Sequence, residues 1–180
     1  MNDSDITALL KRVERLEAIE EIKDLKQRSA LAADPNMDID MFINNYTEDG
    51  IMEIVNWGTV LKGRKEIAGF LAINPFTWMF HCLIPLKIEV ADDLQTATGR
   101  WYLLESATVY NSKTEVYDPV WVMGAYDNDI IKTNDGWKFT HTRLTQEVLT
   151  TYEDGWGGDQ RVNVNPDWVK PVDEFMAGKS

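Results

Sequence analysis

The chain has only two histidines, and one of them, His81, lies inside the apolar run WMFHCLIPLKIEV. Such a run is typical of a core strand. Side chains alternate across a strand, so His81 and its neighbour Cys82 point to opposite faces and do not form a nucleophile pair. A histidine in this setting is more often a core residue held by one hydrogen bond than a catalyst. Its role therefore depends on a partner.

Asp34 is the candidate partner, because it ends the first predicted helix directly before Pro35. An aspartate before a proline is also ordinary turn chemistry, so its position alone carries no functional signal. A buried Asp-His pair, by contrast, orients the imidazole, fixes its tautomer and raises its basicity. Those are the requirements for a base that removes a proton from carbon.

Glu105 is a carboxylate within the aromatic and aliphatic strand segment TGRWYLLES, where Trp101 shares its face. Burial would raise the pKa of Glu105 and make it a second acid or base, whereas on the solvent face it would have no special role. The last predicted strand has one face with His141 and an opposite face with Thr142, Leu144 and Gln146. Composition leaves open which of these faces a cavity.

The elements that must position these residues follow from periodicity. Apolar residues at three-and-four spacing predict an amphipathic helix over residues 4–33, and a shorter helix begins near Asp38. Two short strands flank Asn56-Trp57-Gly58, and a further short helix follows. Residues rich in Val, Ile, Tyr, Trp and Thr then predict long consecutive strands over 78–90, 96–111, 116–132 and 137–150.

Helices followed by a meander of long strands predict an α+β fold: a strongly curved mixed or antiparallel sheet wrapped around the N-terminal helices, like a cone-shaped barrel with an internal cavity. With 180 residues, 44% of them apolar, the chain is expected to form one domain over 1–150. Residues 151–180 are expected to be a C-terminal tail that packs on the body or on a neighbouring subunit.

Composition narrows the partners. The net charge of −12 is spread along the chain, which disfavours nucleic acid and anionic membranes. One cysteine excludes an intramolecular disulfide, and two histidines leave too few ligands for structural zinc. No segment approaches the ~18 apolar residues of a membrane span. We therefore expect a cytoplasmic protein that binds no metal or cofactor.

The order of elements and the segments FHCLIPLKIEVADD, TATGRWYLLES and NDGWKFTHT resemble the SnoaL-like branch of the nuclear transport factor 2-like superfamily over about residues 10–150. This family includes scytalone dehydratase, bile acid 7α-dehydratase and hexachlorocyclohexane dehydrochlorinase. The resemblance implies that Asp34 and His81 form the base dyad and that Glu105 occupies the place of a catalytic aspartate. It also implies that Thr142, Leu144 and Gln146 face the pocket.

The sequence also departs from the family pattern. Ser29 stands where related enzymes have a tyrosine or lysine, Ile54 lies about where the dehydratases have a tyrosine, and Gln146 replaces an arginine. These changes remove the usual donors to a leaving hydroxyl or an enolate oxygen. The step that the resemblance still supports is proton abstraction from carbon.

The leading hypothesis is a cofactor-independent lyase or isomerase acting on a hydrophobic small molecule, with His81 as base, Asp34 orienting it, and Glu105, Ser29 or Gln146 serving the oxygen side. The expected cavity walls are Trp57, Phe80, Trp101, Val122 and Tyr126. Two alternatives stay open: a small-molecule-binding or accessory protein without turnover, and a natural-product cyclase or epoxide hydrolase with Glu105 as acid. The apolar outer face of the sheet predicts a homo-oligomer, which the resemblance suggests is a trimer or dimer.

Overall fold

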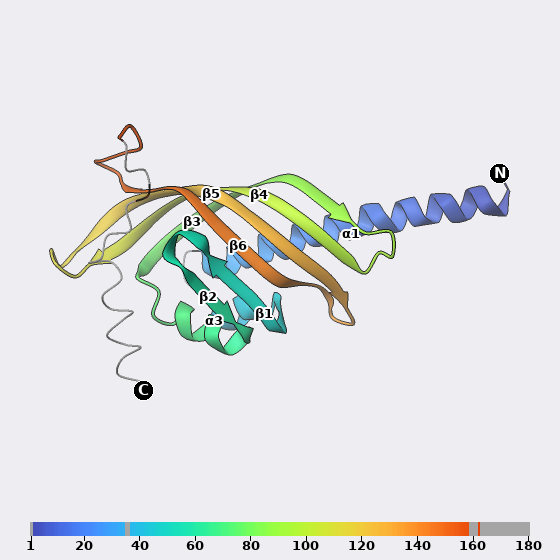
Figure 1. Cartoon of the computed structure of the whole chain (residues 1–180), viewed down its shortest axis with the longest axis horizontal. Helices are drawn as coiled ribbons and strands as arrows, with labels where there is room; N and C mark the ends of the chain where they lie inside the picture. Colours follow the sequence, from blue (N-terminus) through green and yellow to red (C-terminus); the bar gives the residue numbers. More distant parts are fainter. Residues whose placement is uncertain (1, 35–36, 159–161, 163–180) are drawn as a thin grey trace.

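A six-stranded curved sheet partly surrounds a long helix (Figure 1). The computed structural model describes residues 2–34, 37–158 and 162. The strands are β1 (Tyr46–Ile54), β2 (Thr59–Lys62), β3 (Phe76–Val90), β4 (Thr96–Asn111), β5 (Val116–Thr133) and β6 (Gly136–Thr151). Their order is β2-β1-β6-β5-β4-β3, and only β1 and β6 pair in parallel. The predicted curved mixed sheet is confirmed, and it is open, not closed into a barrel.

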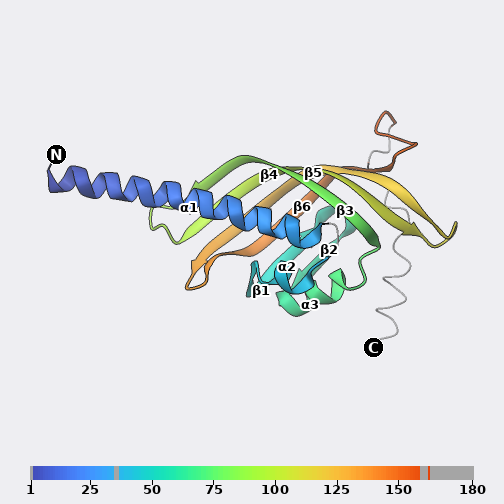
Figure 2. The same ribbon diagram turned by 180° about the vertical axis from the view of Figure 1, so that it is seen from behind.

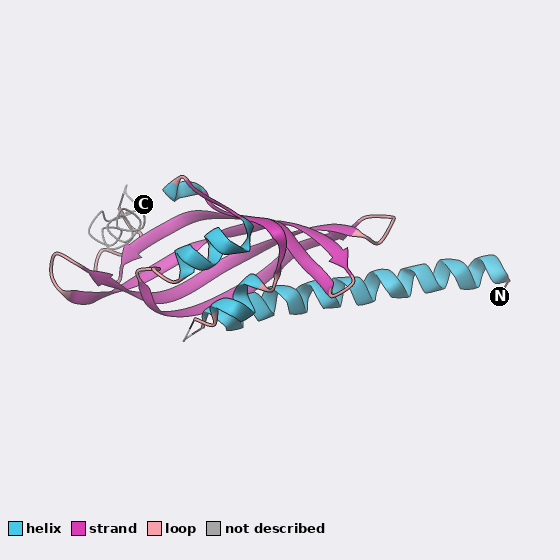
Figure 3. Ribbon diagram, turned by 90° about the horizontal axis from the view of Figure 1, so that it is seen from below, coloured by secondary structure: helices cyan, strands magenta, loops and turns pink. Residues whose placement is uncertain are grey.

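Helix α1 (Asp3–Ala33) begins with a capping box in which Asn2 and Asp5 bond each other's backbone N–H, and it ends at Asp34, whose backbone is extended. Its second half lies across the concave side of the sheet (Figure 2). Its first half extends beyond the strands, as Figure 3 shows from another side.

The predicted amphipathic pattern of α1 is wrong for its first half. The apolar side chains there are between 40% and 63% exposed: Ile6, Leu9, Leu10, Val13 and Leu16. The reason is length, because the helix outruns the sheet that would cover them. The buried positions recur instead along the second half: Ala18, Ile22, Leu25, Lys26, Ser29 and Ala33. They share one face at helical spacing, and that face contains a lysine and a serine.

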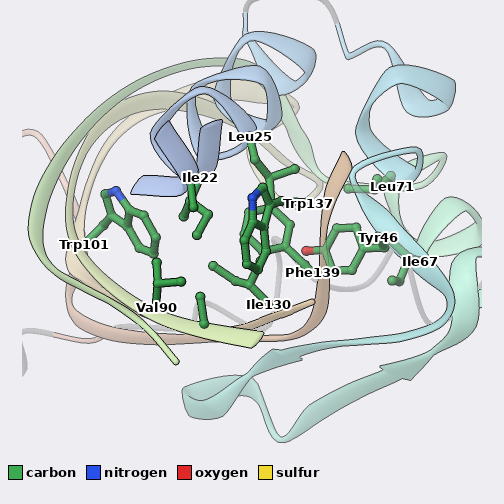
Figure 4. Close-up of a cluster of buried hydrophobic side chains, with 12 residues drawn as sticks. Ile22, Leu25, Tyr46, Ile67, Leu71, Val90, Trp101, Ile130, Trp137 and Phe139 are labelled. Atoms are coloured by element: carbon green, nitrogen blue, oxygen red, sulfur yellow. The ribbon is translucent and has the colours of Figure 1, made fainter. Parts of the chain in front are cut away.

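The sheet curls around this half of α1 to form the main core (Figure 4). Ile22 and Leu25 from the helix meet Trp101 of β4 and Phe139 of β6. Each large apolar side chain buried in this way stabilises the fold by about 1.5–3 kcal/mol. Gly99 makes room for the Trp101 ring, since a Cβ at Gly99 would lie 2.1 Å from an indole carbon.

Two short helices complete the cavity end of the fold. Helix α2 (Ile39–Ile43) contacts α1, and α3 (Gly63–Leu71) contacts both α2 and β1. A short 3-10 turn, η1 (Val55–Trp57), joins β1 to β2 and contacts β6. Together these pieces cover the end of the concave face that the C-terminal half of α1 leaves open.

The predicted tail is only partly within the described residues. Trp156 packs edge-on against Trp121 of β5 with ring centroids 6.2 Å apart, and Val162 bridges to Leu149 of β6. Residues 159–161 and 163–180 lie outside the described part of the chain. The helices that the structure describes include none with the length and apolar character needed to cross a bilayer.

The outer face of β3 and β4 carries exposed large apolar side chains, among them Trp78, Phe80, Ile84, Tyr102 and Leu104. Apolar surface on the outer face of the sheet is the basis of the predicted homo-oligomer, because such surface is commonly covered by a partner. The oligomeric state stays a prediction.

Candidate active site

The end of α1 meets the middle of β3 at Asp34 and His81. One carboxylate oxygen, Oδ1, lies 2.6 Å from His81 Nδ1, and the other, Oδ2, accepts the His81 backbone N–H at 2.8 Å. Because a carboxylate accepts hydrogen bonds, this contact places the ring proton on Nδ1 and leaves Nε2 as the basic nitrogen. Asp34 thus holds both the backbone and the ring of His81.

Glu105 lies directly opposite His81 in the β3–β4 register, and its Oε2 is 3.5 Å from His81 Nε2. Burial raises the pKa of Glu105 to about 7; the His81 charge acts against this rise and the Asp34 charge adds to it. Near neutral pH, Glu105 therefore exists both as an acid and as a carboxylate, so it can give or take a proton.

The pKa of His81 is also displaced. Burial lowers it, but the Glu105 charge together with the hydrogen bond and charge of Asp34 outweigh burial, so the pKa of His81 lies above its ordinary value. His81 and Glu105 then share protons as a coupled pair. With one proton on the pair, moving it from Nε2 to Glu105 leaves a free base and a neutral acid side by side.

His81 and Glu105 line a cavity whose other walls are mostly apolar. The space not filled by atoms, including the open mouth, is about 560 Å³. Five further residues that the sequence predicted for substrate binding also line it: Trp57, Val122, Tyr126, Leu144 and Gln146. The Gln146 side-chain oxygen accepts from Trp57 Nε1 at 2.8 Å, which fixes the amide.

Four predicted substrate-binding residues lie away from the cavity. Phe80 is 55% exposed on the outer face, because alternation along β3 puts it opposite His81. Trp101 is buried in the main core. The Ser29 hydroxyl donates to the Lys26 carbonyl at 2.8 Å, and the Thr142 hydroxyl pairs with Tyr46 at 2.8 Å. None of the four is among the residues that line this cavity, so these wall and donor assignments are corrected.

Sequence reasoning missed Lys26, which is only 3% exposed and has no carboxylate partner among the ion pairs of the described residues. Its Nζ lies 3.4 Å from the ring centroid of Tyr126 and farther from Phe139 and Trp101, at 5.5 and 5.7 Å. Burial lowers the pKa of Lys26 to about 7. The sequence feature that could have indicated the burial of Lys26 is its place on the same helix face as Ile22 and Ser29.

Within residues 2–34, 37–158 and 162, no three His, Cys, Asp or Glu side chains converge in the way that metal ligands do. The side chains at this cavity can perform acid and base chemistry, since they include an oriented imidazole, a carboxyl group with a pKa near 7 and hydrogen-bond donors.

Solved structures with the same fold carry the names of three kinds of enzyme, two of them as candidates. A hexachlorocyclohexane dehydrochlorinase matches at 16% identity, with 78% of this chain and 92% of that chain covered and a TM-score of 0.66. A candidate scytalone dehydratase from Novosphingobium aromaticivorans matches at 18%, covering 79% and 90%, with a TM-score of 0.61. A candidate aromatic ring hydroxylase from the same organism matches at 25%, covering 77% and 96%, with a TM-score of 0.67.

The search of curated proteins finds no match. The family model of the SnoaL-like domain, however, matches residues 14–143, well over half of the chain. That span includes the end of α1, His81, Glu105 and the cavity walls from β1 to β5. The chain therefore belongs to the SnoaL-like domain family.

Proposed function

We propose that this protein is a lyase or isomerase that removes a proton from a carbon atom of a hydrophobic small molecule. The observation that carries the proposal is the pair of hydrogen bonds from His81 to Asp34, which makes Nε2 the basic nitrogen of the ring, beside Glu105 in an apolar cavity. Names of structural relatives agree with the reaction class, since one is a dehydrochlorinase and another a candidate dehydratase.

The reaction begins when His81 Nε2 takes a proton from a carbon next to an electron-withdrawing group. Asp34 stabilises the imidazolium that forms, because its carboxylate already accepts the Nδ1 proton. In an elimination, the electron pair of the broken C–H bond forms a C=C bond, and the leaving group departs with the proton of Glu105. In an isomerisation, the proton returns to a different carbon. Either route restores the protonation state after release of product.

A general carbon-acid probe tests this without knowledge of the natural substrate. Removal of the ring C–H proton of nitrobenzisoxazole breaks its N–O bond and releases a coloured cyanonitrophenolate. The wild-type protein is expected to saturate with this probe and to open the ring faster than His81→Gln. The matched control is His141→Gln, which changes a histidine outside the cavity. Equal rates for the wild-type protein and His81→Gln would reject the proposal.

A second candidate, a cyclase or epoxide hydrolase, is favoured by one observation: Glu105 is a buried acid with a pKa near neutrality that lines the cavity. In that reaction Glu105 protonates a ring oxygen, and His81 has the smaller role. Comparing Glu105→Gln with His81→Gln on an epoxide panel separates the two. A larger loss for Glu105→Gln favours ring opening, and a larger loss for His81→Gln favours carbon deprotonation.

A further inference from the structure

One polar group of the cavity has no part in the base chemistry above. Tyr126 of β5 lines the cavity together with Glu105, and its hydroxyl has no hydrogen-bond partner in the described residues. Ser29 and Thr142, the two hydroxyl residues that the sequence predicted for substrate binding, differ in this respect because both are bonded to other groups. The phenol is thus the hydroxyl left available to a ligand in this cavity.

The phenol remains neutral and keeps its proton. Burial raises the pKa of Tyr126 well above its ordinary value, and the charges of Glu105, Tyr46 and Asp34 add to the rise. A neutral phenol in an apolar cavity is a strong hydrogen-bond donor to an oxygen that gains negative charge. A halide leaving group or an apolar ligand would gain little from a hydrogen bond donated by this phenol.

The Lys26 ammonium group lies over the Tyr126 ring, 3.4 Å from the ring centroid. Asn128 helps to hold this ammonium: its side-chain oxygen is 3.5 Å from Nζ, and its amide donates to the Gly99 carbonyl at 3.3 Å. A cation over an aromatic face draws electron density from the ring. Lys26 does not line the cavity, so its effect on a ligand passes through Tyr126.

We infer that Tyr126 is the oxygen-side catalytic residue of this site, that Lys26 is the positioning residue behind it, and that the substrate carries a carbonyl group. The inference rests on the proposed function. As His81 takes the proton from the carbon next to the carbonyl, the C–H electron pair forms a C=C bond and the carbonyl π pair moves to oxygen. Tyr126 donates its hydrogen bond to that enolate oxygen.

The second step restores the carbonyl. The enolate electrons return, the β-hydroxyl leaves with the proton of Glu105, and the products are an unsaturated carbonyl compound and water. This assignment supplies the oxygen-side donor that Ser29 was expected to provide, because the Ser29 hydroxyl donates to the Lys26 carbonyl instead. Gln146 accepts from Trp57 through its oxygen and keeps its amide N–H groups, so it can add a second donor beside Tyr126.

Turnover of nitrobenzisoxazole gives the first test, because its product carries the new negative charge on oxygen. Tyr126→Phe keeps the ring over Lys26 and removes only the hydroxyl, and about tenfold loss of kcat is expected with little change in KM. Lys26→Met is expected to lose less. In the double variant the Lys26→Met effect should disappear, since Lys26 acts through the phenol. Full additivity would overturn the role of Lys26.

Binding of para-nitrophenolate gives a second test that needs no turnover. Its absorbance reports whether the bound phenol is ionised. Tyr126→Phe should weaken phenolate binding about tenfold and raise the apparent pKa of the bound probe, because a hydrogen bond to a charged oxygen is lost. The matched controls are Tyr102→Phe and Lys87→Met, both on the exposed face of the sheet. Unchanged phenolate binding by Tyr126→Phe would overturn the inference.

The two proposals fail in different ways. If His81→Gln turns over the probe as fast as the wild-type protein, the base assignment fails, whatever Tyr126 does. If His81→Gln is inactive but Tyr126→Phe matches the wild-type protein in both turnover and phenolate binding, the base stands and the oxygen-side assignment fails.

Discussion

The two histidines of the chain each lie between one aspartate and one glutamate. His81 is 2.6 Å from Asp34 and 3.5 Å from Glu105, whereas His141 is 3.2 Å from Glu53 and 4.0 Å from Asp129. Both lie on strands of the same sheet, on opposite faces of it. By residue type alone the two clusters look alike.

The clusters differ in two respects: an arginine lies beside His141, and a cavity lies beside His81. Arg143 lies 3.1 Å from His141 Nδ1, 2.9 Å from Asp129 and 3.7 Å from Glu53, so a permanent cation already pairs with both carboxylates. No such arginine stands beside His81 among the described residues, and its carboxylates act on the imidazole itself. A histidine with carboxylates therefore suggests a base only where no fixed cation takes those carboxylates and a ligand can reach the ring.

The largest expected difference between the two histidines is their effect on the rate of turnover. His81→Gln should lower the rate of nitrobenzisoxazole opening by about 10²–10⁴, the usual contribution of a general base. His141→Gln should stay within about twofold of the wild-type rate, because a surface ion-pair network contributes little. Rates are measured by product absorbance. A similar loss in both variants would remove the distinction between the two sites.

A smaller loss is expected for the orienting carboxylates. Asp34→Asn replaces an acceptor by an amide that can donate to Nδ1, which favours the tautomer with its proton on Nε2. A rate loss of about 10²-fold is expected, and Glu53→Gln is the matched control with no loss. If Asp34→Asn keeps the wild-type rate, Asp34 does not set the tautomer.

Glu105→Gln should change how stability depends on pH. The pKa of Glu105 is about 7 in the folded protein, above its ordinary 4.5. Between these values the unfolded chain has lost the proton and the folded protein keeps it, so the wild-type free energy of unfolding falls as pH rises. The free energy of unfolding of Glu105→Gln minus that of the wild type should therefore be about 3 kcal/mol larger at pH 8 than at pH 4. Urea unfolding at both values measures it.

The smallest effect is expected at the surface cluster. Arg143→Gln removes the cation shared by Asp129 and Glu53, and exposed ion pairs of this kind are worth about 0–1 kcal/mol. Urea unfolding should therefore shift slightly, with unchanged turnover. A loss of turnover in Arg143→Gln would show that the outer cluster communicates with the cavity.

Sequence periodicity was enough for the fold because the long strands carry a strong β pattern and clear turns. The helix end, the strand position of His81 and the family resemblance indicate Asp34 and His81, and the resemblance indicates Glu105. The predicted cavity position of Phe80 is wrong because alternation along β3 puts Phe80, like Cys82, on the face opposite His81.

Other misses have different physical causes. Ser29 and Thr142 are polar and have the sequence positions expected of pocket residues. Hydrogen bonds to Lys26 and Tyr46 occupy their hydroxyl groups, and a single sequence does not show such bonds. Lys26 was missed because a lysine on a helix is normally solvated. Only the three-dimensional contacts reveal that aromatic rings surround its ammonium group.

The most direct measurement is nitrogen NMR of the two imidazole rings in protein labelled at histidine, with His141→Gln used to assign the signals. For His81 it should show a proton on Nδ1, an unprotonated Nε2 at high pH, and a titration above the ordinary histidine pKa of about 6.5. A proton on Nε2 in the neutral ring, or a His81 titration at or below that ordinary value, would contradict the account.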